Sequence, residues 1–463
     1  MASSVSDLLL SLERFSVECE AVGMRISTSK SETMVLSRKP MDCLLQFTMM
    51  RAAVGIWILS AVICLGRGHH HDHGHHGDHK QGHGHGRADQ ESFLQVTSAN
   101  KEFAYSLYRK LAAHADSEGK NTFFSPSSVS VALAALSVGA RGDTHHQLFR
   151  GLGFNNSLLT QTDVDQSFQK LLKKTNDTSQ DISEGTAVFV DNKFKAKPDF
   201  LETLMQSYLA DGFTVDFTQT TDSANTINKY VEDKTNGKID KLVEVLDPST
   251  VMYLISYIYY KGKWATPFDP KLTGEDMFMV DGKTKVPVQM MYKNRRSDIY
   301  IDRAINTSVL HLPFNSSYSM LLLLPDDMST LENAISPAHV TKWFKSMTSS
   351  EHRVYIPKFS IKTSYKLNDV LVEMGMTDMF GERADLSGIS DANQLSVSEV
   401  VHQATLDVDE AGATAAAATG VGIMLTSSFF TPVLKFNRPF MVMITERNTD
   451  KVLFMGKIIN PNL

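Results

Sequence analysis

Hydrophobic positions recur along the chain with two different periods, and the helical period comes first. Phe103, Leu107 and Leu111 are spaced as on one face of a helix, and the apolar run over 129–136 predicts a buried helix. A further amphipathic helix is predicted to end before the Asn-Gly turn at 236–237.

Strand-like runs dominate the second half of the chain. They are MYLISYIYY at 252–260, YSMLLLLP at 318–325, the alternating HRVYIPKFSIK at 352–362, VVHQATLDV at 400–408, and two strands within 435–458 that turn at 448–450. We find no β-helix-β alternation and no internal repeat. The pattern therefore predicts an α+β chain with long antiparallel strands.

One segment near the C-terminus fits neither period. Residues 410–431 read EAGATAAAATGVGIMLTSSFFT, with only small, uncharged side chains in the first half after the opening glutamate. Alone, such a tract is typical of a flexible linker, because it buries too little apolar surface to fold. Its interpretation depends on what surrounds it.

The segment FTMMRAAVGIWILSAVICLGRG at 47–68 has the layout of a secretory signal, with a basic residue, a short apolar run and small residues at the cleavage position. The run is too short for a comfortable membrane span. We place the natural start at Met49 or Met50 and the signal over 49–68. Residues 1–48 include SLERFSVECEAVGMRISTSKSETMVLSRK, which resembles a reverse-transcriptase fragment of long interspersed retroelements, so we expect a spurious or exonised extension there.

A histidine-rich stretch at 69–86 holds nine of the sixteen histidines. Imidazoles at this density can bind zinc or copper loosely. Because the glycine spacing fixes no coordination cage, a disordered tail over 69–96 is favoured, and no metal site is predicted.

Composition and net charge make some classes of binding partner unlikely. The 463 residues are 42% hydrophobic and 21% charged, and a net charge of -6 without a long basic run argues against nucleic acid and anionic membranes. All three cysteines precede residue 65, so the body can form no disulfide. Four sequons, which fit a secreted glycoprotein, begin at Asn155, Asn176, Asn306 and Asn315.

No catalytic signature emerges from the motifs. The chain has no G-x-S-x-G elbow, no H-E-x-x-H, no phosphate loop, no dinucleotide fingerprint and no cysteine nucleophile in its body, which lowers the expectation of an enzyme. Arg141-Gly142-Asp143 could be an integrin-binding tripeptide. Its position directly after an apolar helix favours a turn between helices.

Several motifs together indicate a family. NTFFSPSSVSVALAALSVGARGDTHHQL, INKYVEDKTNGKIDKL, YKGKWATPFDP, DEAGATAAAAT, and LKFNRPFMVMI followed by FMGKIINP resemble those of serpins in order and spacing, from about residue 97 to the C-terminus. Within the family the chain is similar to the alpha-1-antitrypsin group of vertebrate plasma. The resemblance implies one α+β domain over 97–463, with three β-sheets, about eight or nine helices and an exposed reactive loop at about 410–432.

The resemblance gives the small-residue segment a function. It would be a bait loop that inserts as a new strand into the largest sheet after a protease cuts it, with Glu410 outside as the pivot. Because alternate residues of a strand face opposite sides, Ala413, Ala415, Ala417 and Thr419 would face inward, and insertion would bury no unpaired charge. The remaining hinge residues are Gly412, Thr414, Ala416 and Ala418.

Two ways of counting place the cleaved bond differently. Counting from Glu410 gives the favoured bond, Thr426–Ser427, whose threonine suits an elastase-like pocket for small or β-branched side chains. Counting back from 436–437 moves the bond toward the C-terminus, and larger residues nearby would suit a chymotrypsin-like pocket. The alternative positions are Met424, Leu425, Ser428 and Phe429.

Insertion also requires the sheet to open. By resemblance, Ser125, Ser128 and His402 form a polar cluster beneath the sheet, and Trp264 lies where the loop first enters. Ser256 stands where the family usually has asparagine, so one side-chain bond of the cluster is expected to be lost or water-mediated. The alternative for each residue is ordinary hydrogen bonding of a buried polar group.

The sequence therefore predicts a secreted, extracellular inhibitor that acts as a suicide substrate and forms a covalent one-to-one complex with an elastase-like or chymotrypsin-like serine protease. We expect a monomer that is not an enzyme and needs no cofactor. The alternative is a non-inhibitory serpin that carries a small apolar hormone or binds another protein. The alanine-rich hinge argues against it, since a carrier does not need small residues there.

Overall fold

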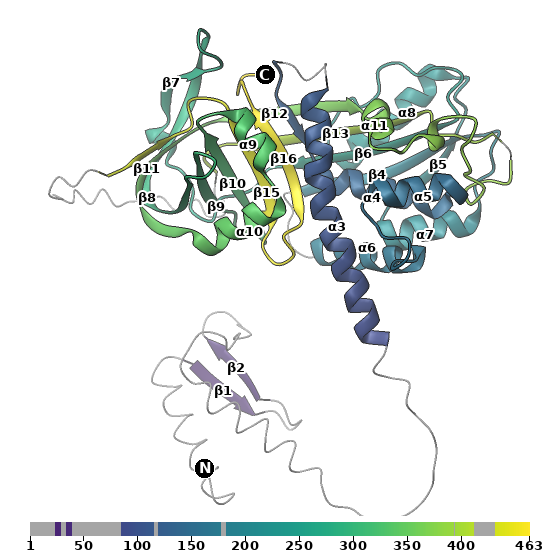
Figure 1. Cartoon of the computed structure of the whole chain (residues 1–463), viewed down its shortest axis with the longest axis horizontal. Coiled ribbons are helices and arrows are strands. Elements are labelled where there is room, and N and C mark those ends of the chain that lie inside the picture. The colour runs from purple at the N-terminus through teal and green to yellow at the C-terminus, as the bar shows by residue number, and fades with distance from the viewer. Residues whose placement is uncertain are drawn as a thin grey trace, which may run out of the picture. The chain divides into compact units, whose positions relative to one another are not determined.

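The computed structural model describes residues 24–28, 34–38, 85–114, 119–176, 182–392, 394–411 and 431–463. The chain divides into two units, Met1–Lys80 and Gln81–Leu463. In the first unit, β1 (Met24–Thr28) and β2 (Met34–Arg38) pair antiparallel. The other described elements belong to the second unit (Figure 1).

Nine α-helices lie within the described residues. They are α3 (His85–Ala113), α4 (Pro126–Gly139), α5 (Gly142–Gly151), α6 (Gln161–Asn176), α7 (Pro198–Tyr208), α8 (Thr220–Lys234), α9 (Met328–Ala334), α10 (Pro337–Ser346) and α11 (Asn368–Glu373), with the short 3-10 helices η2 (Pro270–Leu272) and η3 (Asp378–Phe380). None of the helices in these ranges has the length and apolar character to cross a membrane.

Helix α3 corrects one expected boundary. It begins at His85, so residues 85–96 of the predicted disordered tail are helical. Val96 in this part is fully buried in the main hydrophobic core. The sequence did not predict this part of the helix, because the residues before position 90 are polar and spaced by glycine. The helix is stabilised by the packing of its later turns and not by the local helix propensity of its first residues.

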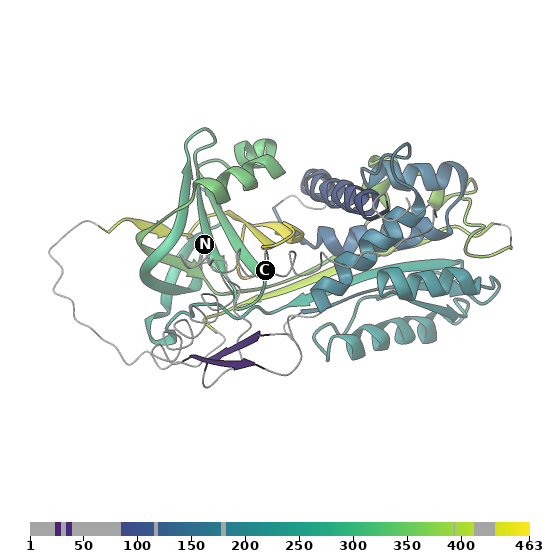
Figure 2. The same cartoon turned by 90° about the horizontal axis from the view of Figure 1, so that it is seen from below.

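A five-stranded sheet forms the centre of the second unit. Its strands follow the order β12 (Phe359–Lys366), β13 (Glu399–Val408), β6 (Met252–Tyr260), β4 (Ile182–Asp191) and β5 (Asp211–Val215). Every residue of β6 is buried: helices lie on both faces of the sheet (Figure 2), and Ile258 and Tyr260 near the end of the strand pack in a core shared with a second sheet. Helix α4 packs on one face, and α8 packs on the other through Ile227 and Val231.

A nine-stranded sheet lies beside it, on the left in Figure 1. The order is β14 (Val433–Lys435), β11 (Thr348–Pro357), β8 (Lys285–Asp302), β9 (Thr307–Pro313), β10 (Tyr318–Pro325), β15 (Phe440–Glu446), β16 (Val452–Ile458) and β3 (Thr122–Phe124), with β7 (Gly274–Met279) also paired to β8. The long strand β8 contacts β7, β11 and β9 at different points along its length, so it joins two of the expected sheets into one.

The predicted strand positions hold with one exception, although β6 and β13, β4 and β5, and β11 and β14 pair parallel and not antiparallel. Strands β6 and β10 match the predicted bounds, and β15 and β16 turn at the predicted position. The run at 352–362 was predicted as a single strand, but it splits at Lys358 into β11 and β12. These two strands belong to different sheets, and an alternating pattern carries no information about which partner each half will find.

Candidate functional site

The two central strands of the five-stranded sheet run in the same direction. Strands β6 and β13 pair parallel in a register from Glu399–Tyr253 to Leu406–Tyr260, while their outer neighbours β4 and β12 pair antiparallel to them. A chain that turns back after β13 would run antiparallel to both central strands. The β6–β13 seam is therefore the place in this sheet where a returning strand would find two suitable partners.

The chain after β13 is held by backbone bonds before it leaves the sheet. We call Asp409–Ala411 the proximal root. The Trp264 backbone N–H donates to the Ala411 carbonyl oxygen at 3.0 Å, and the Phe268 N–H donates to that of Glu410 at 3.1 Å. The Trp264 indole N–H donates to the Asp409 carbonyl oxygen at 2.7 Å. Trp264 thus contacts the proximal root through both its backbone and its indole ring.

Glu410 is the most constrained side chain of the proximal root. One carboxylate oxygen lies 2.8 Å from the Lys358 ammonium, and the other accepts a hydrogen bond from the Thr273 hydroxyl at 2.7 Å. Burial by itself would raise the pKa of Glu410, but the bonds from Lys358 and Thr273 outweigh it and hold the pKa below its ordinary value. Beside it, Asp409 pairs with Lys261 at 2.8 Å.

The predicted polar cluster is present under the β6–β13 seam. His402 on β13 is fully buried, and its Nε2 accepts from the Ser125 backbone N–H at 2.9 Å. The proton of the neutral imidazole is therefore on Nδ1, which lies 2.9 Å from the Ser256 hydroxyl oxygen on β6. The expectation that Ser256 leaves this bond lost or water-mediated is wrong, because the shorter serine side chain still reaches the ring.

The cluster continues along the start of α4. The Ser125 side chain caps this helix by accepting from the Ser128 N–H at 3.1 Å, and its hydroxyl also lies 3.0 Å from that of Ser128. Sequence reasoning missed the next members. The Ser128 hydroxyl donates to Glu184 on β4 at 3.3 Å, and Glu184 lies 3.7 Å from the largely buried Lys451 ammonium.

The missed residues carried no local signal. Glu184 and Lys451 are 267 positions apart, by subtraction of their numbers, and Lys358 precedes Glu410 by 52. No motif spacing links such pairs, and Glu184 and Lys451 even belong to different sheets, because β4 lies in the five-stranded sheet and Lys451 precedes β16 of the nine-stranded one. Ion pairs between such distant segments become visible only once the topology is known.

His402 gives the site a measurable acid sensitivity. Burial lowers its pKa to about 3, with a hydrogen bond to the Ser256 backbone opposing the shift. An unfolded histidine titrates near about 6.5. Between these values the unfolded chain binds a proton that the native protein does not, so the free energy of unfolding falls as pH falls.

We expect His402 to account for a loss of roughly 2 to 3 kcal/mol between pH 7 and pH 4.5. Urea unfolding of the wild type and of His402→Gln at both pH values tests this. The variant should be less stable at pH 7, yet lose less stability on acidification. An equal loss in both proteins would assign the acid sensitivity to other groups.

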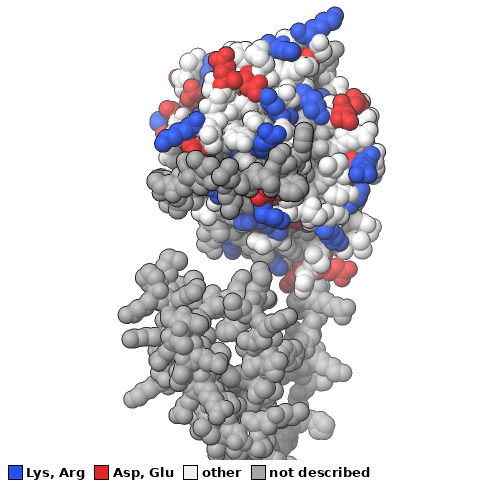
Figure 3. Space-filling model, turned by 90° about the vertical axis from the view of Figure 1, so that its left-hand side faces the viewer, with Lys and Arg blue, Asp and Glu red and all other residues white. Residues whose placement is uncertain are grey.

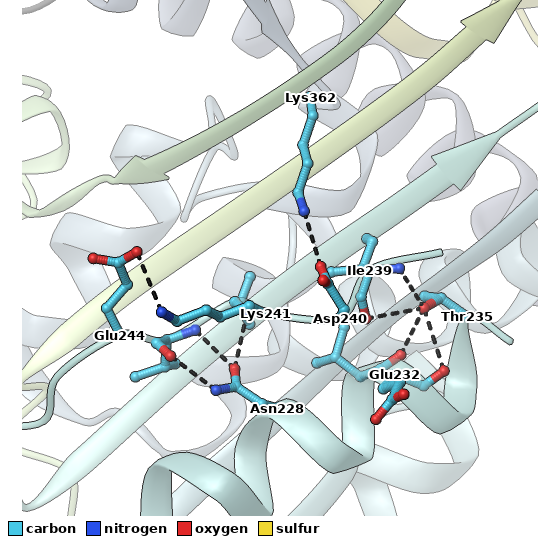
Figure 4. A network of polar contacts seen from close by, with 11 residues as sticks. Asn228, Glu232, Thr235, Ile239, Asp240, Lys241, Glu244 and Lys362 are labelled. Atoms are coloured by element: carbon cyan, nitrogen blue, oxygen red, sulfur yellow. Dashed lines mark hydrogen bonds and ion pairs between the residues drawn. The ribbon is translucent and has the colours of Figure 1, made fainter. Parts of the chain in front are cut away.

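A cover lies across the other face of the seam. It consists of α8 and residues 235–246, whose apolar side chains pack against Tyr253 and Ile255. In Figure 4 the Asn228 side chain ties the two parts together, donating to the Val243 carbonyl at 2.8 Å and accepting from the Leu242 N–H at 2.8 Å.

The cover also reaches the far side of the seam. Helix α8 packs over β4 and β6, whereas Asp240 pairs with Lys362 on the edge strand β12 at 3.1 Å (Figure 4). The cover thus bridges β6 and β13, and a strand that entered between them would have to displace it. Both members of the Asp240–Lys362 pair are exposed, so this link is weak.

The hinge positions Gly412–Thr419 and the candidate cleavage positions Met424–Phe429 lie outside the described residues. The chain resumes at Thr431–Pro432, which we call the distal root. Asn155, Asn306 and Asn315 are exposed, as glycosylation requires, while the side chain of Asn176 lies outside the described ones.

The integrin-binding alternative does not fit the geometry. Arg141 is the residue before the first turn of α5, and its guanidinium group donates to the carbonyl oxygens of Val138 and Ala140 at 2.9 and 2.7 Å. Gly142 adopts a positive φ of 52°, which glycine tolerates at this turn. Arg141 lies in the turn between α4 and α5, and Gly142 and Asp143 begin α5, so the tripeptide lies at the junction of two helices that the sequence predicted.

Comparison with known proteins agrees with this architecture. The family model described as "Serpin (serine protease inhibitor)" matches residues 98–461. Serpin A3-5 of Bos taurus is 41% identical over 372 residues, covering 79% of this chain and 89% of that protein. Serpin A3-2 of the same species is 40% identical over 372 residues, again covering 79% and 89% respectively.

A solved structure shares the fold. Human thyroxine-binding globulin superposes with a TM-score of 0.75 at 33% identity, covering 80% of this chain and all of that one (100%). The predicted family and α+β fold are confirmed. The curated relatives named here are of the A3 group, which refines the group suggested by the sequence.

Proposed function

The chain belongs to the serpin family, and on this basis we propose that it is a secreted serine protease inhibitor that acts once per molecule. The observation that carries the proposal is the parallel β6–β13 seam, with the loop leaving directly from the end of β13. After cleavage of the loop, residues from Gly412 onward turn back and enter the seam. The protease, held as an acyl ester on the new end of the loop, is carried away with it.

The energy of such an insertion is large enough to trap an enzyme. The β6–β13 register comprises the pairs from Glu399–Tyr253 to Leu406–Tyr260. A strand placed between them replaces one parallel ladder by two antiparallel ladders, a gain of roughly eight to ten hydrogen bonds at about 1 kcal/mol net each. This is similar to the whole stability of a typical domain, about 5 to 15 kcal/mol.

The buried surroundings of the seam explain the composition of the hinge. On one side of β6, Leu254 and Ile258 pack into two neighbouring hydrophobic cores, whereas Tyr253 and Ile255 face the cover on the other side. An inserted strand would be enclosed on both faces, so a charged side chain on either face would lose its water without gaining a partner. The alanines and threonines at 413–419 meet this requirement.

Hormone carriage is the second candidate, because thyroxine-binding globulin is a structural relative. Two cavities lined by α3 in the described part each have a volume of about 30 Å³. A pocket for a small organic ligand typically needs about 300 to 1,000 Å³. The two small cavities are therefore too small for a hormone. A larger hollow of about 560 Å³, between the end of α3 and β12, is lined by the exposed side chains of Lys120, Lys362 and Lys366, which do not suit a small apolar ligand.

One experiment separates the two candidates. The purified protein is incubated with elastase, chymotrypsin and trypsin, complexes are sought on denaturing gels, and the cut is located by mass spectrometry. We expect a stable complex with elastase or chymotrypsin, with Thr426–Ser427 as the favoured bond. The cleaved protein should melt roughly 10 to 20 °C higher than the intact one, from about 10 kcal/mol of insertion energy. Clean cleavage without a complex and without this gain would contradict the proposal.

A further inference from the structure

A group of arginines lies beside the distal root of the loop. Arg295 and Arg296 are exposed on β8, and Arg353 lies on the neighbouring strand β11. The Arg353 backbone N–H donates to the Pro432 carbonyl oxygen at 2.9 Å, and Arg353 pairs with Val433 in the ladder. This end of the molecule faces the viewer in Figure 3, where lysine and arginine side chains are spread over its surface.

The arginine charges are little compensated. Within the described ranges none of the three guanidinium groups forms an ion pair, and Arg296 donates to the Ser349 carbonyl oxygen at 2.6 Å. The Nε of Arg353 is buried without a hydrogen-bond partner there. Two acids lie nearby, Glu351 opposite Arg296 and Asp298, which is 3.4 Å from His311.

Positive charge extends from these arginines toward the proximal root. Lys293 on β8 is partly buried, and its ammonium donates to the Thr266 carbonyl oxygen at 3.3 Å and lies 5.4 Å from the centre of the Phe268 ring. Burial, and then the charge of Arg295, lower the pKa of Lys293 to about 8. Phe268 is the residue whose N–H binds Glu410, so Lys293 lies between the proximal root and the arginines beside the distal root.

We propose that Arg295, Arg296 and Arg353 form a docking surface for acidic side chains around the active site of the target protease. The proposal rests on the proposed function, because an enzyme that cuts the loop must place the surface around its active site against the protein surface near the two roots. The trap is covalent, so binding strength after cleavage does not decide which enzyme is captured. The association rate constant decides which enzyme is captured, and complementary charge raises this constant by about 10- to 1,000-fold.

The charge of both partners can be varied in a matched way. We would measure the second-order association rate constant of the protein with native elastase or chymotrypsin, whichever forms the complex, and with its succinylated form, in which surface lysines carry carboxylates. The test variant is Arg295→Glu with Arg296→Glu. The control is Arg150→Glu with Lys195→Glu, the same change in net charge at two exposed positions on α5 and before α7.

For the wild type and the control, we expect the succinylated enzyme to be captured roughly tenfold faster at low salt, with the advantage shrinking as salt is raised. The test variant should lose or reverse this preference while it still forms the complex. Equal preference in all three proteins would overturn the docking surface alone. Heparin binding by the wild type but not the test variant, with equal preference, would assign the surface to polyanions and also overturn it. No complex in any pairing would overturn the proposed function itself.

Discussion

Replacing Ala415 by arginine is expected to turn the protein from an inhibitor into a substrate that the protease cleaves and releases. The proposed insertion places Ala415 between two covered faces of the sheet, where an unpaired charge costs several kcal/mol. A penalty of about 3 kcal/mol on the insertion step slows it roughly a hundredfold, so hydrolysis of the acyl ester overtakes it. The number of inhibitor molecules consumed per trapped enzyme, measured by titration, should rise from about one to more than about ten.

Ala415→Thr is the matched control, because threonine is small and uncharged and already occurs at other hinge positions. It should titrate the enzyme almost as the wild type does. If the arginine variant also inhibits one to one, Ala415 does not enter the sheet.

Replacing Glu410 by lysine is expected to destabilise the native protein by about 3 kcal/mol or more. Glu410 is only 8% exposed, and the substitution leaves Lys358 without a partner and places a second ammonium beside it. Release of the proximal root should also ease opening of the seam. Urea unfolding at pH 7 measures the first effect, and loss of inhibitory activity on standing at 37 °C measures the second.

The charge-swapped protein, Lys358→Glu with Glu410→Lys, is the control. It restores an ion pair in the same place, so it should recover most of the stability. Because the native contacts hold the pKa of Glu410 below its ordinary value, their contribution is present at neutral pH and is lost as acid protonates the carboxylate. The difference between wild type and Glu410→Gln should therefore shrink in acid. A difference that does not depend on pH would show that the ion pair is not its source.

Much of this architecture could be read from hydrophobic patterns. The nine apolar or small residues of β6 predicted a strand with matching bounds, because a strand covered on both faces needs no polar positions. The hinge could be read for a similar reason, since a segment that must be a loop first and a buried strand later tolerates only small, uncharged side chains. These features are local, and their causes lie in the residues themselves.

Contacts between distant segments could not be read in this way. In the sequence, Lys358 is one polar position in an alternating run. In the structure it lies between β11 and β12, which belong to different sheets, and it pairs with Glu410. Ser256 looked like a missing hydrogen bond, yet the backbone of β6 and β13 brings its hydroxyl within 2.9 Å of His402. Both outcomes depend on distances between strands, which side-chain periodicity does not determine.

The central claim is that the β6–β13 seam opens to admit the cleaved loop, and a reversible lock tests it most directly. Ile258 and Ala404 face each other across the seam and are fully buried. Residues 65–463 contain no cysteine, so Ile258→Cys with Ala404→Cys introduces one disulfide between neighbouring strands, whose Cα separation of about 5 Å suits the bond. We predict that the oxidised variant is cleaved without trapping the protease and that reduction restores the covalent complex. Trapping by the oxidised variant, with the disulfide verified intact, would contradict the account.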